Sequence, residues 1–143
     1  TIEKEEIDDS ITSSDYEVDM DALKINRISP ETKASDFKSH ISTEVGYKIE
    51  NLSGQEIQNG DFIGTGYTLV TDTGKEYTLI VTGDLNGDGE VKLTDVSMIR
   101  KHYLEVETLQ GIYEEAADID NNGNISLNDI SMMRKFILGV QKI

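Results

Sequence analysis

The chain has 143 residues, enough for one domain of typical size or two small ones. It contains no Cys and two His, which excludes disulfides and Cys-based zinc sites and argues against a histidine-rich metal site. Its net charge of −15 argues against binding to nucleic acid or to an anionic membrane, and no segment approaches the ~20 apolar residues of a membrane-spanning helix.

The first 21 residues are rich in Asp and Glu and poor in apolar side chains. Because such a segment buries little apolar surface, residues 1–21 are expected to form an acidic linker or N-terminal extension that orders only near its end. The chain opens at Thr1 rather than Met, which suggests a fragment of a longer protein. We expect no enzyme activity in this fragment; a catalytic part of the parent protein would lie upstream.

Residues 22–82 have the pattern of a small β-rich module with one short helix. Thr32 is expected to cap a helix over Lys33–Ile41. The segment Gly64-Thr65-Gly66 lacks the context of a phosphate-binding loop and is interpreted as a turn or bulge. The predicted strands, which turn residues separate, are a first strand around Leu23–Ile28 and then Val45–Glu50, Gly66–Thr71 and Glu76–Val81.

Residues 83–143 contain an internal duplication, since residues 84–104 align with residues 118–138 without a gap. A stacked repeat array requires three or more copies, so two copies predict a closed pair. The identical positions are Asp84/Asp118, Gly89/Gly123, Leu93/Leu127, Asp95/Asp129, Ser97/Ser131, Met98/Met132, Arg100/Arg134, Lys101/Lys135 and Leu104/Leu138.

Each copy opens with an oxygen-rich loop, Asp84–Asp95 or Asp118–Asp129, whose spacing fits a calcium site. Ca²⁺ takes six to eight oxygen ligands, which such loops supply from positions 1, 3, 5, 7, 9 and 12, with Gly at position 6 for the sharp turn. Position 7 contributes its backbone carbonyl, and Ser126 at position 9 is expected to act through a water. The predicted ligands of two Ca²⁺ ions are Asp84, Asn86, Asp88, Glu90 and Asp95, and Asp118, Asp120, Asn122, Asn124, Ser126 and Asp129.

Both loops have Asp at position 12, where a standard EF-hand has Glu. An alternative interpretation is a polar turn in which Asp95 and Asp129 only cap helices; one residue can also serve as cap and ligand at once. The matched flanks of the two loops favour the calcium interpretation. Each loop offers three carboxylates, which predicts broadly similar affinities.

A strand, rather than the entering helix of an EF-hand, precedes the first loop, and a helix is expected after each loop. A short connecting helix is predicted at Ile112–Ala117. The side chains predicted to form the small helical core are Val96, Ile99 and Tyr103, with their copies Ile130, Met133 and Ile137. The fold class is therefore α+β, a small β-rich module followed by an all-α region of two calcium-loop–helix (F-hand) repeats.

The C-terminal segment resembles the dockerin domain of bacterial cellulosomes and related surface assemblies. The resemblance covers residues 83–139 and is carried by GDLNGDGEVKLTDVSMIRKHYL and ADIDNNGNISLNDISMMRKFILG. It implies a calcium-dependent protein–protein interaction module. Such a module is a monomer when free and docks its parent onto a cohesin module of a scaffoldin or surface protein. It also implies an extracellular or cell-surface location in a bacterium, in the context of polysaccharide degradation.

The resemblance also implies which residues contact the cohesin. Loop positions 10 and 11 are Leu-Thr and Leu-Asn here, where many type I dockerins carry a hydroxyl pair. Glu105 against Gly139 breaks the duplication, so the two faces are not expected to bind equally. The implied contact residues are Leu93, Thr94, Ser97, Arg100, Lys101, Leu104 and Glu105, and Leu127, Asn128, Ser131, Arg134, Lys135 and Leu138.

Two other functions remain open at this point. An EF-hand-like calcium sensor or buffer would have entering helices and a groove that opens with Ca²⁺. A structural, calcium-stabilised C-terminal module of a secreted enzyme would need the metal but no cohesin. An enzyme active site within the β-rich module has few candidate groups.

Overall fold

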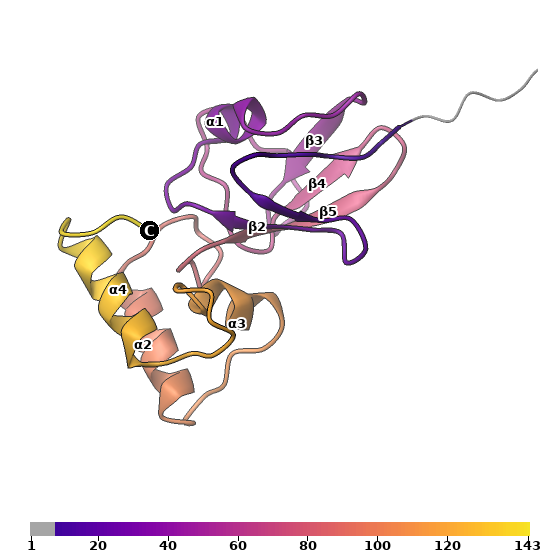
Figure 1. The fold of residues 1–143 in the computed structure, drawn as a ribbon. Coiled ribbons are helices and arrows are strands. Elements are labelled where there is room, and N and C mark those ends of the chain that lie inside the picture. The colour runs from indigo at the N-terminus through magenta and orange to yellow at the C-terminus, as the bar shows by residue number, and fades with distance from the viewer. Residues whose placement is uncertain (1–7) are drawn as a thin grey trace, which may run out of the picture.

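The structure is a computed structural model that describes residues 8–143. A five-stranded sheet with one short helix, here called the sheet module, is followed by a helical region of three helices (Figure 1). None of the described helices is long and apolar enough to span a membrane. The elements are β1 (Glu17–Asp19), β2 (Lys24–Ile28), α1 (Ala34–Ser39), β3 (Tyr47–Glu50), β4 (Thr68–Thr71), β5 (Glu76–Val81), α2 (Leu93–Tyr103), α3 (Ile112–Ala117) and α4 (Leu127–Ile137).

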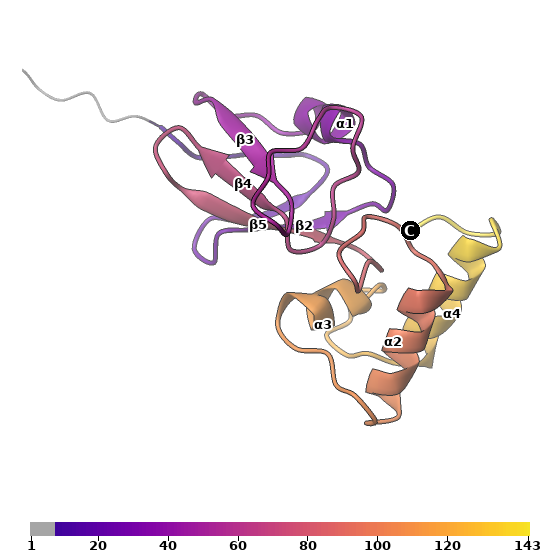
Figure 2. The ribbon, with the colours of Figure 1, turned by 180° about the vertical axis from the view of Figure 1, so that it is seen from behind.

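The strands lie in the order β1-β2-β5-β4-β3, with β2 and β5 parallel and the other neighbours antiparallel. Successive side chains of a strand point to opposite faces of the sheet. In β5, Leu79 and Val81 accordingly join the core of the sheet module, whereas Ile80 joins the core of the helical region. This central strand therefore links the two cores, with α1 and α3 on opposite sides of it (Figure 2).

The acidic N-terminal segment differs from the expected linker over its described part. Ile11 is buried in the sheet module, and the ring of Tyr16 stacks on Phe37 with centroids 5.3 Å apart. Strand β1, which pairs with β2, also lies in this segment. The sheet module thus includes residues 8–21, because isolated apolar side chains find a place in its core. Residues 1–7 of the predicted linker lie outside the described residues.

Helix α1 is shorter than predicted, and Thr32 does not cap it. The Thr32 hydroxyl donates to the Ser29 carbonyl at 2.6 Å instead, and Lys33 occupies the N-cap position. The first helical amides, those of Ala34 and Ser35, donate to the carbonyls of Asp61 and Asn59. A neighbouring loop therefore satisfies the amides that a side-chain cap would otherwise bond.

The other elements follow the predicted pattern closely. Strand β5 and helix α3 have the predicted bounds, and β3 and β4 each begin two residues later than predicted. Four of the six predicted core side chains, Val96, Ile99, Ile130 and Met133, are buried between α2 and α4. The prediction that Tyr103 belongs to this core is wrong: Tyr103 is the last residue of α2 and is 43% exposed.

Candidate calcium and partner-binding site

The first loop is organised by its two terminal aspartates. Asp84 accepts hydrogen bonds from the amides of Gly87 (3.0 Å), Asp88 (3.2 Å) and Gly89 (2.9 Å), which curl the chain around its carboxylate. Asp95, in the first turn of α2, accepts from the amides of Leu85 and Lys92. Both carboxylates are buried. Asp95 thus orders the start of the helix while facing the loop interior.

The second loop has a similar set of bonds to its terminal aspartates, but Asp129 accepts from the amide at loop position 3, whereas Asp95 accepts from the amide at position 2. Asp118 accepts from the amides of Asn122 (3.2 Å) and Gly123 (2.9 Å). Asp129, in the first turn of α4, accepts from the amides of Asp120 (3.0 Å) and Ser126 (2.8 Å). The duplication in sequence is therefore accompanied by a largely similar loop geometry.

The carboxylates of Asp118, Asp120 and Asp129 each place one oxygen within 4.8 Å of the others. Two ligands of one Ca²⁺, each 2.3–2.6 Å from the ion, lie no more than about 5 Å apart. The donors are hard oxygens and their spacing fits that limit, so the second loop fits a calcium ion.

The carboxylates of the first loop are arranged less tightly. Lys92 at position 9 pairs with Glu90 at 2.7 Å and lies 3.8 Å from Asp88. Among residues 8–143, only the carboxylate triple of the second loop meets the spacing of a metal cluster. Lys92 has no side-chain oxygen to offer a cation, and nothing in the sequence indicated that its ammonium would lie beside Asp88 and Glu90.

The remaining predicted ligands support the loop backbone. Side-chain oxygens at positions 3 and 5 of each loop accept from the amide two residues later, which is a common turn for Asp and Asn. These side chains are Asn86 and Asp88 in the first loop and Asp120 and Asn122 in the second. The Ser126 hydroxyl lies 3.4 Å from the Asp129 carboxylate, and Asn124 is exposed.

The electrostatics of the loops favour a cation. Burial raises the pKa of Asp84 to about 6, although amide hydrogen bonds from Thr65 and Gly89 oppose the change. Burial also raises the pKa of Asp95 and of Asp129. The side chain of Asn128, which donates to Asp120 at 2.8 Å, lowers the pKa of that carboxyl. Burial thus disfavours the ionised forms of Asp84, Asp95 and Asp129, and a divalent cation nearby would stabilise them.

The raised pKa of Asp84 predicts that calcium affinity depends on pH. Because the folded pKa of about 6 lies above the ordinary value of 3.8, the metal-free fold loses stability as pH rises through this range. Calcium must displace the proton from Asp84 below about pH 6, so affinity at the first loop is expected to fall there. Calorimetric titrations in buffers of different ionisation enthalpy should show proton release on binding below that pH and little or none well above it. Equal affinity on both sides would contradict the prediction.

The sheet module closes over the first loop, a contact that the sequence did not reveal. The Thr65 amide donates to the Asp84 carboxylate at 2.8 Å, and the Glu31 amide donates to the Gly89 carbonyl at 2.7 Å. Gly89 is buried, whereas its copy Gly123 is exposed. The two loops therefore differ in environment. The sequence signal for this contact was the segment Gly64-Thr65-Gly66, which by itself predicts only a turn or bulge.

Substituting Gly64 with Ala tests this contact. A Cβ there would collide with the Gly87 carbonyl and lie 2.8 Å from the Tyr67 ring, whereas a Cβ at Gly60 would meet nothing within 4 Å. Both glycines lie outside the left-handed region. We expect Gly64→Ala to lower the free energy of unfolding by about 2–3 kcal/mol and Gly60→Ala to leave it nearly unchanged, as measured by urea unfolding. Similar stabilities would contradict the contact.

The predicted partner residues lie mostly on the exposed sides of α2 and α4. Leu93, Leu104, Leu127 and Leu138 are each more than 60% exposed. The exception is Ser131, which is partly buried; Asn128 is exposed, and its amide donates to Asp120 in the second loop. Val106 and Val140, which sequence reasoning did not single out, are also exposed and hold equivalent positions in the two copies. Exposed apolar side chains in matched pairs indicate a binding surface.

Helices α2 and α4 lie antiparallel, and a hollow at each end of the pair is lined by residues of both copies. The distal hollow joins the end of α2 to the start of α4, and the module-side hollow joins the start of α2 to the end of α4. Each end thus mixes both copies. The distal hollow is lined by Arg100, Tyr103, Leu104, Leu127, Ile130 and Arg134, and the module-side hollow by Glu31, Val91, Lys92, Leu93, Thr94, Phe136 and Ile137.

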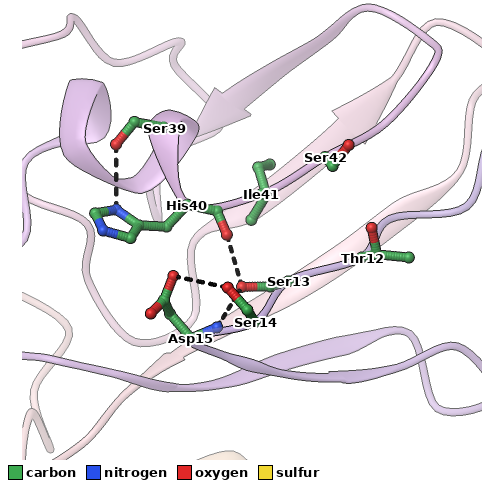
Figure 3. Close-up of a pocket in the computed structure, with 8 residues that line it drawn as sticks. All are labelled: Thr12, Ser13, Ser14, Asp15, Ser39, His40, Ile41 and Ser42. Carbon is green, nitrogen blue, oxygen red and sulfur yellow. Dashed lines mark hydrogen bonds between the residues drawn. The ribbon is translucent and has the colours of Figure 1, made fainter.

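A polar hollow in the sheet module gathers Ser, His and Asp side chains (Figure 3). The Ser13 hydroxyl donates to the His40 carbonyl at 2.6 Å, and the Asp15 carboxylate accepts from Ser14 at 3.4 Å. The His40 Nδ1 lies 2.6 Å from the Asp36 carbonyl. These hydrogen bonds connect the N-terminal segment with the end of α1. Among residues 8–143, no hydrogen bond is found between Asp15 and His40, so the two do not form a catalytic triad with a serine.

Comparison with known proteins assigns the helical region. No curated protein gives a significant match to the chain. The sequence profile of the family described as Dockerin type I domain matches residues 82–138, which include both loops, α2, α3 and α4. Residues 82–138 are therefore a dockerin type I domain, which follows a five-stranded sheet module.

Proposed function

We propose that the helical region binds two Ca²⁺ ions and, so ordered, docks its parent protein onto a cohesin in an extracellular bacterial assembly such as a cellulosome. A dockerin type I domain is a non-catalytic binding module that implies a cohesin partner, and dockerins typically bind calcium. The observation that carries the proposal for this chain is the matched pair of loops, with their repeated hydrogen bonds and the carboxylate cluster of the second loop.

The exposed surface supports the partner part of the proposal. Leucine pairs at Leu93/Leu127 and Leu104/Leu138 lie beside cationic pairs at Arg100/Arg134 and Lys101/Lys135, all on the outside of α2 and α4. Apolar anchors with Arg beside them are typical of protein interfaces, and the charges suit an acidic partner surface. The pseudo-twofold arrangement allows a cohesin to bind in two orientations.

The two orientations are not equivalent in their surroundings. A partner over the module-side hollow would meet Glu31 of the sheet module, whereas one over the distal hollow would meet only α2 and α4. The negative charge of Glu31 would disfavour an acidic partner at the module-side hollow. We therefore expect the distal hollow to lie nearer the centre of the preferred interface.

Binding to a panel of purified cohesins, measured by calorimetry in calcium and in EDTA, tests the proposal. We expect tight binding of at least one cohesin in calcium and none in EDTA. Asp129→Asn, which removes one carboxylate charge of the second loop, is expected to weaken both calcium and cohesin binding. Calcium binding without any cohesin binding would instead favour a structural calcium-stabilised module.

A further inference from the structure

We propose that Arg27 of the sheet module is a positioning residue for the second loop, an inference that rests on the calcium-binding function proposed above. Arg27 lies in an irregularity of β2, where pairing with β5 passes from Ile25–Leu79 to Ile28–Val81. Its φ is 65°, in the left-handed region that residues with a Cβ rarely adopt. An uncommon conformation that aims a long side chain at another element indicates a constraint of the surrounding structure.

The guanidinium of Arg27 grips the start of the second loop. Nη1 donates to the Asp118 carbonyl at 2.8 Å, and Nη2 donates to the Ile119 carbonyl. These carbonyls belong to the two peptide units between Asp118 and Asp120, whose carboxylates are the first two predicted ligands. Within residues 8–143, Arg27 makes no ion pair. Its planar fork therefore fixes the orientation of two successive peptide units.

Apart from Arg27, the described part of the sheet module makes few contacts with the second loop. Residues 121–124 are exposed, and the one hydrogen bond found between Asn121 and the part of the sheet module that the structure describes is a 3.4 Å bond to exposed Glu17. In the first loop Asp84, Gly87 and Gly89 are instead buried, and the loop is bonded to the backbones of Thr65 and Glu31. Arg27 thus gives the second loop the support from the sheet module that Thr65 gives the first. Removing a residue that orients the ligands of a metal ion typically lowers the affinity for the metal 10- to 100-fold.

The positive charge of Arg27 acts in the opposite direction, because it repels a cation nearby. Two substitutions separate the effects. Arg27→Lys keeps the charge but loses the fork, and Arg27→Met loses both charge and donors. Each retains a Cβ, so the left-handed strain at this position stays the same. If positioning dominates, both variants bind calcium more weakly at the second loop; if repulsion dominates, Arg27→Met binds more tightly.

Calcium titration of the full chain, followed by the NMR amide signals of Gly89 and Gly123, resolves the loops. Each amide donates to the first carboxylate of its own loop at 2.9 Å. We expect both variants to shift the Gly123 midpoint to roughly tenfold higher calcium while the Gly89 midpoint stays within about twofold. The control Lys24→Met removes a cation of the same strand that pairs with Glu115 on α3, and should move neither midpoint.

Three results would overturn the inference. The Gly123 midpoint could stay unchanged or fall in Arg27→Met, or both midpoints could rise alike, which would indicate general destabilisation. If Gly123 in the unsubstituted chain failed to respond to calcium, the proposed function would fail together with the inference. If it responded and the Arg27 variants behaved like the unsubstituted chain, only the role of Arg27 would be wrong.

Discussion

Removing calcium with EDTA is expected to abolish most of the helical circular dichroism signal of this protein. Without a cation, the carboxylates of Asp118, Asp120 and Asp129 face one another within 4.8 Å. Helices α2 and α4 have 11 residues each, below the ~12–15 at which isolated helices become even marginally stable. Each calcium site at 100 times its Kd would contribute about 2.7 kcal/mol, so the metal decides whether these helices form.

The sheet module should stay folded in EDTA, because its core contains no residue of either loop. Phe37, Leu69 and Tyr77 are fully buried in this core, which is separate from the core of the helical region. Amide signals of β3 and β4 should therefore persist while those of α4 collapse, and added calcium should restore them. Retention of the helices in EDTA would contradict the prediction and favour a calcium sensor, which rearranges its helices rather than losing them.

Reversing the charges on both helices is expected to abolish cohesin binding, whereas reversing them on one helix should not. Arg100, Lys101, Arg134 and Lys135 are exposed, and their copies present similar surfaces. With Arg100→Glu and Lys101→Glu alone, a cohesin can turn so that it relies on Arg134 and Lys135, and we expect weakened binding rather than its loss because Arg100 and Arg134 both line the distal hollow. With all four substitutions, both orientations place like charges together, and we expect affinity to fall by at least ~100-fold, about 2.7 kcal/mol.

Controls separate this result from unfolding. Among residues 8–143 the four side chains lie outside both cores and have no hydrogen bond or ion pair to either loop, so calcium affinity and helix content should be unchanged. The one ion pair found for them is that of Lys101 with exposed Glu107, at 3.6 Å. Lys48→Glu on β3 changes charge on the sheet module and should not affect binding. Complete loss with the first pair alone, in a folded chain, would show that one orientation is used.

The loops and the helices after them could be predicted because their signals are local. All the predicted ligands of one site lie within a loop from Asp84 to Asp95 or from Asp118 to Asp129, and glycine, capping aspartate and helical spacing agree with one another. Strand β5 was predictable from its β-branched and aromatic residues. Its residues Leu79, Ile80 and Val81 are apolar in succession because the strand is covered on both faces by different cores.

Contacts between distant segments could not be predicted. Thr65 precedes Asp84 by nineteen residues, and its useful group is a backbone amide, which carries no sequence signature. Arg27 depends on a strand irregularity, and Ile11 is an isolated apolar residue within an acidic segment. Each of these depends on which segments the fold brings together.

The unequal burial of the two loops has an evolutionary consequence. A Cβ at Gly89 would lie 2.6 Å from the Ile63 carbonyl oxygen, whereas one at Gly123 would meet nothing within 4 Å. The second copy is therefore freer to accumulate substitutions, being limited mainly by its own backbone and by the metal. The first copy must change in concert with the strand connection that covers it. Two halves that began alike would then drift apart at different rates, and new partner specificities would arise more readily in the second.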